Sequence, residues 1–371
     1  MANNNENKIL NVPHLRFPEF SGEWKKCKLG DLCNVLMCKR ILVSQTNTED
    51  GVPFYKIGTI GSTPDAYISK ELFDDYKVKY NYPRKGEVMI TCAGTVGKCV
   101  VYDGEDAYFQ DSNIVWIDNP TQYISNGFLF HLLSKVDWRK LNSTTIIRIY
   151  NDDLRNLKMS YPRKEEQQKI SHLLSLLDER IATQNKIIDK LQSLIKGIAQ
   201  NIVSNNKPNI RLSDCLDCSS STLQESDVCE TGIYPVYGAN GIVGYLDNYN
   251  TEGEAVYIIK DGSGVGTVSY ATGKCSATGT LNTLQAKDGY SLQYLYYILK
   301  VFNFEPYKTG MAIPHIYFKD YGKAKIFCPS YTEQLRYARL QSAIDSKLSV
   351  EKNILTSLSS QKQYLLRQMF I

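Results

Sequence analysis

The sequence predicts an α+β protein in which two pseudo-symmetric, strand-rich domains are separated by two long helices packed as an antiparallel coiled coil. A helix-like segment that follows Pro162 recurs after Pro329 at a constant offset of 167 residues. Each copy comes after a stretch rich in β-branched and aromatic residues, and these stretches also correspond. The expected parts are a first domain over 1–160, a helix over 161–205, a second domain over 206–328 and a helix over 329–371.

Length and composition limit the class of protein. A chain of 371 residues is too long for one ordinary core, which favours two domains. Its ten cysteines show no secreted-framework spacing, and we expect reduced thiols in a cytoplasmic protein. The sequence contains no run of about eighteen apolar residues, so we expect no membrane span. The net charge is only +4, so attraction to phosphates cannot by itself account for binding to nucleic acid.

The two helical segments carry a heptad pattern. Apolar residues recur at alternating steps of four and three, which is typical of a coiled-coil seam. Gln184 and Glu351 occupy the same seam position in the two copies, and a polar seam residue tends to fix register at some cost in stability. The alternative is two surface helices, each packed on its own domain. The side chains expected to pack the two helices together are Ile170, Leu174, Leu177, Ile181, Ile188, Leu191, Ile344, Leu348, Leu355, Leu358 and Leu365.

The strand-rich stretches share an order of elements. "EVMITCAGTVGKCVVYDG" from Glu87 and "EAVYIIKDGSGVGTVSYATG" from Glu254 both read as strand, Gly-rich turn and strand. "YISNGFLFHLLSKVDW" and "SLQYLYYILKVFNF" then predict short buried helices, and we expect His131 to be a satisfied core residue. Pro162 and Pro329 suit the first turn of each long helix. The domains diverge more than the helices, which favours binding two different targets, although decay after duplication also explains it.

Motifs for catalysis or metal binding are not recognisable. A P-loop that contained Gly97-Lys98 would need a glycine at position 92 and a serine or threonine at position 99, and both positions are cysteines, Cys92 and Cys99. The Gly-rich turns are therefore better explained as hairpins. Cys215 and Cys218 form a lone pair without the second pair that structural zinc requires, and no histidine has a metal-spaced partner. We also find no nucleophile elbow. A self-sufficient enzyme is therefore not expected.

The sequence resembles the specificity (S) subunit of type I restriction–modification systems. The resemblance is carried by "VPHLRFPEFSGEWKKCKLGDL", by "GMAIPHIYFKDYGKAKIFCPSYTEQ", by the Glu-Gln pair that opens each long helix and by the duplicated architecture. It covers the chain from about Val12 to the C-terminus. One departure is the approach to the first long helix, "STTIIRIYNDDL", which lacks the glycine and proline of its counterpart.

The resemblance implies a function. Residues 1–160 and 206–328 would be target-recognition domains that each read one part of a split sequence in double-stranded DNA. The helices would form a spacer, about 60 Å long for roughly 40 residues. Two methyltransferase (M) subunits would grip this chain and restriction (R) subunits would join them. This chain would be non-catalytic and carry no cofactor, while its partners use S-adenosylmethionine, ATP and magnesium.

Polar and basic residues at strand ends and Gly-rich turns are the candidates for DNA contact, because base edges and phosphates are bound by such side chains. His315 stands in the second half where Arg148 stands in the first. The candidates in the first domain are Lys56, Thr59, Ser62, Thr95, Lys98, Ser112, Asn113 and Arg148. Those in the second are Tyr237, Asn240, Lys260, Ser263, Lys274, Thr278, Asn282 and His315.

Two other functions compete with DNA recognition. A coiled-coil scaffold with two protein-binding domains would explain the same architecture. An enzyme with unrecognised motifs is the third alternative. Salt-dependent DNA binding with two separated footprints would favour recognition over the scaffold, and methyl transfer by this chain alone would favour the enzyme.

Overall fold

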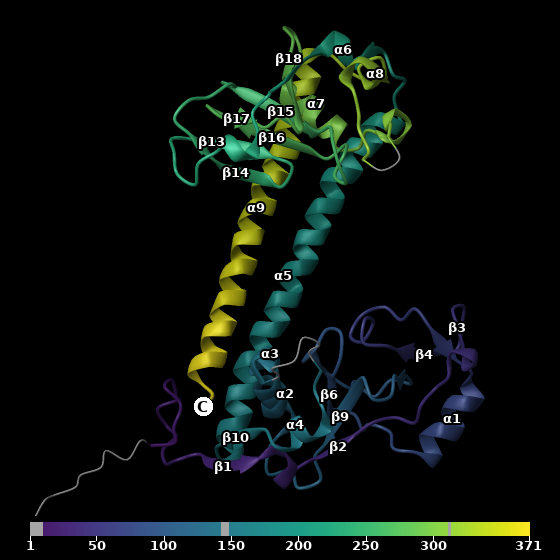
Figure 1. Ribbon diagram of the computed structural model, residues 1–371, viewed down its shortest axis with the longest axis vertical. Helices are drawn as coiled ribbons and strands as arrows, with labels where there is room; N and C mark the ends of the chain where they lie inside the picture. Colours follow the sequence, from purple (N-terminus) through teal and green to yellow (C-terminus); the bar gives the residue numbers. More distant parts are fainter. Residues whose placement is uncertain (1–9, 142–147, 311–312) are drawn as a thin grey trace, which may run out of the picture. The chain divides into compact units, whose positions relative to one another are not determined.

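A computed structural model describes residues 10–141, 148–310 and 313–371 of the chain (Figure 1). The chain divides into two compact units. The first comprises the residues up to Ala182 together with Thr356–Ile371, and the second comprises Thr183–Leu355. Each unit contains one strand-rich domain and a part of each long helix. The segment "STTIIR", where the first-half departure begins, lies outside the described residues except for Arg148.

Short strands and helices build the domain of the first unit. Its helices are α1 (Lys70–Lys79), α2 (Asn126–Lys135), α3 (Trp138–Leu141) and α4 (Asn151–Arg155). Its strands are β1 (Lys25–Lys28), β2 (Asn34–Leu36), β3 (Thr46–Asn47), β4 (Val52–Tyr55), β5 (Tyr67–Ile68), β6 (Val88–Thr91), β7 (Cys99–Val101), β8 (Tyr108–Phe109), β9 (Ile114–Asp118) and β10 (Lys158–Tyr161). They form sheets in the orders β2-β9-β6-β7, β3-β5-β4-β8 and β1-β10.

The second unit repeats this plan. Its helices are α6 (Leu212–Cys215), α7 (Leu292–Leu299) and α8 (Phe318–Tyr321). Its strands are β11 (Ile210–Arg211), β12 (Leu216–Ser220), β13 (Tyr234–Gly238), β14 (Gly241–Leu246), β15 (Glu254–Ile259), β16 (Val268–Thr272), β17 (Ser276–Ala277), β18 (Leu281–Ala286) and β19 (Lys325–Ile326). The sheet orders are β12-β18-β15-β16, β14-β13-β17 and β11-β19.

Corresponding strands occupy corresponding places in the two sheets. The antiparallel hairpins β6–β7 and β15–β16 lie at the same edge of their four-stranded sheets. Each unit also has one parallel pair, β4 with β8 and β13 with β17. The predicted hairpins and short buried helices are therefore confirmed, and the duplication extends to strand order.

Each four-stranded sheet is buried on both faces. In the first unit, Val88 and Ile90 pack toward α2 and the long helices, while Met89 and Trp116 pack against the second sheet. Such two-sided burial explains why β6 reads as a continuous apolar run. A buried side chain of this kind contributes roughly 1.5–3 kcal/mol, so the sheet forms the centre of the domain.

A glycine in each hairpin turn lets an aromatic side chain pack against the backbone. Gly97 has a φ of +84°, and a Cβ there would lie 2.2 Å from Trp138. Gly266 has a φ of +91°, and a Cβ there would lie 3.1 Å from Phe304. Both aromatic residues follow the short helix of their unit. The turns are thus held against the domain in the same way in both halves.

The two long helices are α5 (Lys164–Ser204) and α9 (Tyr331–Gln368) (Figure 1). Pro162 and Pro329 lie two residues before them, so they precede the first helical turn that the sequence assigned to them. In the second unit, Gln184 contacts Glu351 and Ile195 contacts Gln341, so rising numbers on α5 pair with falling numbers on α9 and the helices are antiparallel. The fold class predicted from the sequence is confirmed in this respect.

The heptad residues lie where the two helices meet. In the first unit, Ile170, Leu174 and Leu177 share a core with Leu365, while Leu358 is buried and Ile181 half-buried. In the second unit, the cluster between the helices contains Ile188, Leu191, Ile344, Leu348 and Leu355, together with Ile195 and Tyr297. Nine of these eleven predicted side chains join clusters that contain residues of both long helices, so the two helices pack together within each unit separately.

The Glu-Gln pair that opens each long helix has an observable structural role. Gln167 accepts a hydrogen bond from the backbone N–H of Ser125, the N-cap of α2, at 2.7 Å, and its amide donates to the carbonyl of Pro162. Gln334 makes the same two bonds, from Ser291 at 2.9 Å and to Pro329. Each glutamine therefore ties its long helix to the short helix of the same domain.

The preceding glutamates differ. Glu166 is fully buried and forms a two-point ion pair with Arg16, with both N–O distances at 2.7 Å. Glu333 instead accepts hydrogen bonds from Ser330 at the start of α9. The identical residue is used to hold the N-terminal segment in one half and to cap a helix in the other.

Polar residues in the seam are paired. The Gln184 amide donates to the Glu351 carboxylate and to its backbone carbonyl, the latter at 3.1 Å. In the same unit, Gln341 donates to the carbonyl of Ile195. In the first unit, Lys362 pairs with Asp178. Since a buried polar group without a partner is costly, these pairings favour one register of the two helices.

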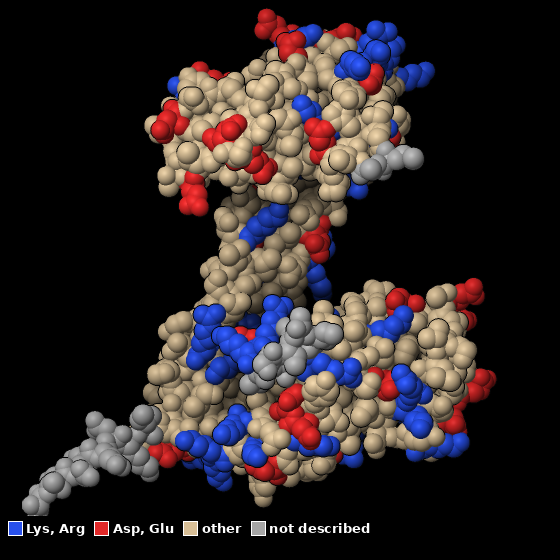
Figure 2. All heavy atoms as spheres, viewed as in Figure 1, with Lys and Arg blue, Asp and Glu red and all other residues tan. Residues whose placement is uncertain are grey.

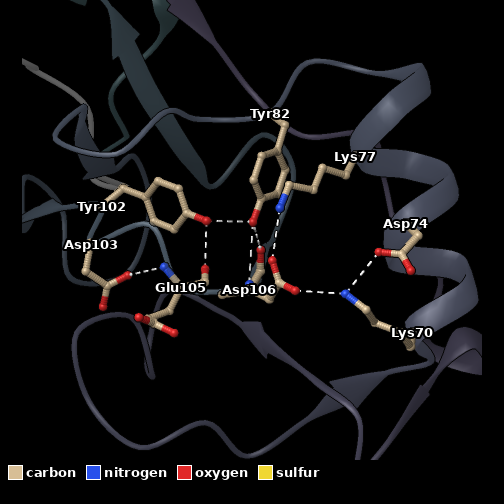
Figure 3. A network of polar contacts seen from close by, with 9 residues as sticks. Lys70, Asp74, Lys77, Tyr82, Tyr102, Asp103, Glu105 and Asp106 are labelled. Atoms are coloured by element: carbon tan, nitrogen blue, oxygen red, sulfur yellow. Dashed lines mark hydrogen bonds and ion pairs between the residues drawn. The ribbon is translucent and has the colours of Figure 1, made fainter.

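Helix α1 is fastened to the first domain by a polar network (Figure 3). Lys70 and Lys77 both contact Asp106, at 2.8 and 2.9 Å. Beneath them, the Tyr82 hydroxyl donates to the carbonyl of Ala107 and lies 2.9 Å from the hydroxyl of Tyr102. Exposed ion pairs stabilise little, so the half-buried Tyr82 and the buried Tyr102 contribute more to the attachment than the lysines.

His131 is buried as expected, but it is not fully satisfied. The side chain is 1% exposed and Nδ1 has no hydrogen-bond partner within the described part of the chain. Nε2 lies 3.5 Å from the Ser175 hydroxyl. The pKa of His131 is lowered to about 4, mainly by burial; Asp178 opposes this shift, and Lys362 adds to it. The expectation of a satisfied histidine was therefore wrong for one of its two nitrogens.

The histidine makes stability depend on pH. The pKa of His131 is about 4 in the folded chain and has its ordinary value of 6.5 in the unfolded chain. Between pH 6.5 and pH 4, His131 therefore binds a proton in the unfolded chain but not in the folded one. Stability is therefore lost as the pH falls from 6.5 toward 4. Between pH 7 and pH 5, the free energy of unfolding should fall by roughly 2 kcal/mol less in His131→Leu than in the wild type. Urea unfolding at both pH values measures this, and equal pH slopes for both proteins would contradict it.

Candidate nucleic-acid interface

The eight candidates of the first domain lie on connected loops at one end of the strands of the four-stranded sheet. This loop surface is called the edge of the domain below. The hydroxyl of Thr95 donates to the carbonyl of Ile57 at 3.2 Å, and Lys98 donates to that of Ile60 at 2.5 Å. These bonds join the turn after β6 to the loop that contains Lys56, Thr59 and Ser62. On the other side of the turn, the backbone N–H of Cys92 donates to the carbonyl of Asn113.

Arg148 extends this edge. Its guanidinium donates to the carbonyl of Ser112 at 3.2 Å and lies 5.9 Å from the ring of Tyr150. Thr95, Lys98 and Ser112 are exposed, whereas Thr59 and Asn113 are half-buried. The structure thus brings together residues that are up to 92 positions apart, from 56 to 148.

Three candidates of the second domain occupy the equivalent place. Lys260 and Ser263 belong to the turn after β15, and the backbone N–H of Ile316 donates to the carbonyl of Lys260 at 3.0 Å. The backbone N–H of Gly262 donates to the carbonyl of Pro314 at 3.0 Å. His315 is therefore held directly on this turn, as Arg148 is held beside its counterpart.

The other candidates of the second domain are dispersed. Lys274 lies at the opposite end of the β15–β16 hairpin, where it contacts Glu252 and Tyr249. Asn240 lies in the tight turn between β13 and β14. Tyr237 packs on Tyr257 with ring centroids 5.2 Å apart. The sequence could not show this separation, because it depends on which hairpin end each loop joins.

Thr278 and Asn282 require a correction. They are only 1% and 4% exposed. Thr278 bonds to the hydroxyl of Thr280, and Asn282 bonds to Tyr321 and Ser220. Since these side chains are buried in the fold and partnered there, we remove them from the set that can reach DNA. For the remaining candidates, contact with DNA stays a prediction.

Three residues at this edge were missed by the sequence reasoning. Asp261 contacts the Nδ1 atom of His315. Tyr150 and Tyr317 are 62% and 46% exposed and lie beside Arg148 and His315 respectively. The 167-residue offset equates both pairs, so comparison of the two halves could have found the tyrosines.

The described side chains at this edge offer hydrogen-bonding groups and charges. Burial raises the pKa of the Cys92 thiol to about 12, so this cysteine next to the first turn is neither a nucleophile nor a ready metal ligand. Across the described residues, no group of three or more His, Cys, Asp and Glu side chains is placed to hold a metal ion. The two cysteines of the pair noted in the sequence have different partners: the Cys215 thiol donates to the carbonyl of Arg211, and the Cys218 thiol donates to that of Ser219.

A hollow of about 540 Å³ adjoins the first turn, between Gly94–Lys98 and the Ser134–Arg139 segment. Figure 2 shows basic side chains gathered on this unit, with acidic ones interspersed. No helix in the described part of the chain is both long and apolar enough to cross a membrane. This face of the unit thus carries both basic and acidic side chains, so selective contacts can accompany general attraction to phosphates.

Comparisons with known proteins point to one family. The profile of the family described as "Type I restriction modification DNA specificity domain" matches residues 21–193 and again residues 208–360. A putative type I restriction enzyme specificity subunit of Haemophilus influenzae is 45% identical over 189 residues, which are 51% of this chain and 46% of that protein. The chain thus spans about half the length of this relative.

Two further similarities come from Mycoplasma genitalium. A putative type I specificity subunit is 26% identical over 255 residues, covering 61% of this chain and 65% of that protein. The crystal structure of a type I restriction–modification system S subunit superposes with a TM-score of 0.68 and 19% identity, over 97% of this chain and 99% of that one. Because the sequence identity to this crystal structure is only 19%, the superposition shows a shared fold and nothing more. Because the family profile matches most of the chain, in two copies, the chain belongs to the type I restriction modification DNA specificity domain family.

Proposed function

We propose that this chain is the DNA sequence-specificity subunit of a type I restriction–modification complex. Its two domains read the two parts of a split target, and the paired helices α5 and α9 set the distance between those parts. The chain itself is non-catalytic. The observation that carries the proposal is the presence of two equivalent loop edges, each built on the same strand order but furnished with different side chains.

The differences between the two edges support the reading of two unlike sequences. Arg148 in the first edge is replaced by His315 in the second, and Ala93 is replaced by Asp261. An arginine presents donors only, whereas a neutral histidine presents one donor and one acceptor. Base edges in the major groove differ in their pattern of donors and acceptors. Equivalent positions with different hydrogen-bonding groups therefore favour different bases.

The modest charge of the chain fits a shared role in DNA binding. Phosphate contacts position a protein on the duplex and base contacts specify the sequence. We propose that two methyltransferase subunits, and restriction subunits where present, supply much of the phosphate contact. In this proposal the partners also carry S-adenosylmethionine, ATP and magnesium. They bind the outer faces of α5 and α9, where Ile187, Leu194, Val350 and Ile354 expose apolar surface.

The direct test is to map methylated adenines in DNA from cells that express this chain with its methyltransferase subunits. We expect a two-part sequence with a gap of constant length. An uninterrupted target would contradict the proposal. A coiled-coil scaffold would leave no sequence-specific methylation that depends on this chain, and methyl transfer by the chain alone would favour an enzyme.

The spacer predicts the effect of removing one heptad from each helix. The pair Ile181–Ile187 and Leu348–Ile354 is chosen because Gln184 and Glu351 bond to each other and are removed together. Seven residues at 1.5 Å shorten each helix by about 10 Å, which corresponds to roughly 3 base pairs. Both parts of the target should persist with a shorter gap. Sequencing of methylated DNA measures the gap, and the length-preserving double variant Gln184→Leu/Glu351→Leu is the control. An unchanged gap after deletion would show that the helices do not set it.

The two domains should also be exchangeable. Replacing residues 206–328 with the corresponding domain of another family member should change one part of the target and keep the other, because each loop edge is complete within its own unit. The same methylation mapping provides the measurement. If both parts change together, recognition is not modular.

A further inference from the structure

The backbone of His315 is fixed on the Gly-rich turn of the second domain. Thr309 and His315 exchange two backbone hydrogen bonds, each of 2.8 Å. On either side of His315, the carbonyl of Pro314 accepts from Gly262, and the N–H of Ile316 donates to Lys260. Two of these four bonds tie the segment to residues 260–262, and the other two tie it to Thr309. The position of the imidazole is therefore set by the same turn that carries the candidate DNA-contacting residues.

The imidazole ring has one occupied and one open nitrogen. Nδ1 contacts the Oδ1 atom of Asp261. One face of the ring lies against Tyr317, with centroids 4.0 Å apart. No described residue bonds to Nε2. Since Nε2 is not one of the buried polar atoms without a partner among the described residues, it is accessible to solvent. The side chain is 24% exposed. Contacts on one side of the ring thus leave Nε2 as the group available to a ligand.

The first half lacks this arrangement for a chemical reason. Cys92 and Lys260 are equivalent, because their carbonyls accept from Ile149 and Ile316 respectively. The next residues are Ala93 and Asp261. An arginine side chain presents only donors, and it needs no neighbour to define them. A histidine has two neutral tautomers, and the partner of one nitrogen decides what the other presents. The second turn thus carries an aspartate where the first turn carries an alanine.

We propose that Asp261 is a positioning residue that holds the proton of His315 on Nδ1, so that Nε2 is presented as a hydrogen-bond acceptor to an exocyclic amino group of a DNA base. In the major groove, this group is the N6 amino group of adenine or the N4 amino group of cytosine. The inference rests on the proposed function and assigns one specificity-determining contact within it.

Burial, more than the surrounding charges, favours the neutral form of His315. Asp261 favours the protonated ring, whereas burial and the neighbouring Lys260 disfavour it. Burial is the larger of these two effects, and the pKa of His315 lies below its ordinary value. The remaining neighbours are Thr309 and Tyr317, and Lys319 lies 5.0 Å from the ring of Tyr317. A neutral ring with its proton directed at Asp261 can only accept through Nε2.

The experiment uses the complete complex with its methyltransferase subunits and maps methylated sites for a set of variants. His315→Gln keeps an acceptor at a similar reach and should retain the target. His315→Lys offers only donors and should lose about tenfold in preference at one base position. Asp261→Asn leaves the tautomer undefined and should weaken preference at the same position, with the rest of the target unchanged. The matched control is the carboxylate-to-amide change Glu252→Gln, at the opposite end of the hairpin, which should leave recognition unaltered.

A pH series on binding to the mapped site provides a second readout. Protonation of Nε2 places a donor against a donor, so affinity of the wild-type complex should fall as the medium is acidified, and His315→Gln should not show this fall. If His315→Lys binds as well as wild type with unchanged base preference, the residue contacts phosphate and the inference is overturned. A wild-type complex without any two-part target would overturn the proposed function itself. Variants that leave every base position unchanged would overturn only the role of His315 and Asp261.

Discussion

The packing of α5 against α9 is the interaction on which the rest of the structure depends. A helix with one apolar seam is not stable alone in water, since most of its stability comes from covering that seam. In each unit, part of one helix covers part of the other, and the domain packs on the same core. The polar seam residues are paired with each other or with backbone groups. Slippage by a heptad would separate Gln184 from Glu351, so register and stability have the same origin.

The glutamines at the helix starts connect this seam to the domains. Gln167 and Gln334 each bond the N-cap of a short helix and the proline carbonyl before the long one. The short helix packs on the four-stranded sheet, and the sheet carries the hairpin whose Gly-rich turn lies at the candidate edge. Each candidate edge is therefore linked to the long helices through a few hydrogen bonds and one buried sheet. Side chains at the candidate edge can therefore change without disturbing the sheet, the short helix or the long helices.

That division explains where the halves agree and where they diverge. Residues that hold the framework recur, such as the N-cap serines and the turn glycines against Trp138 and Phe304. Residues at the edge differ in hydrogen-bonding character, as Arg148 and His315 do. A substitution in the framework leaves a cavity or an unpaired polar group, whereas a substitution at the edge changes only what can be bound. The same sheet can thus support two distinct sets of contacts.

The sequence by itself determined the duplication, the two long helices, the hairpins and the short buried helices, because heptad periodicity, alternation and glycine turns are local signals. It also placed the family through motifs that recur at a fixed offset. Only the tertiary structure decided that Thr278 and Asn282 are buried, that Lys274 lies apart from Lys260, that His131 lacks a partner for one nitrogen and that Asp261 meets His315. These facts depend on contacts between segments distant in the chain, and a side chain's exposure and partners are properties of that packing, which no local pattern encodes.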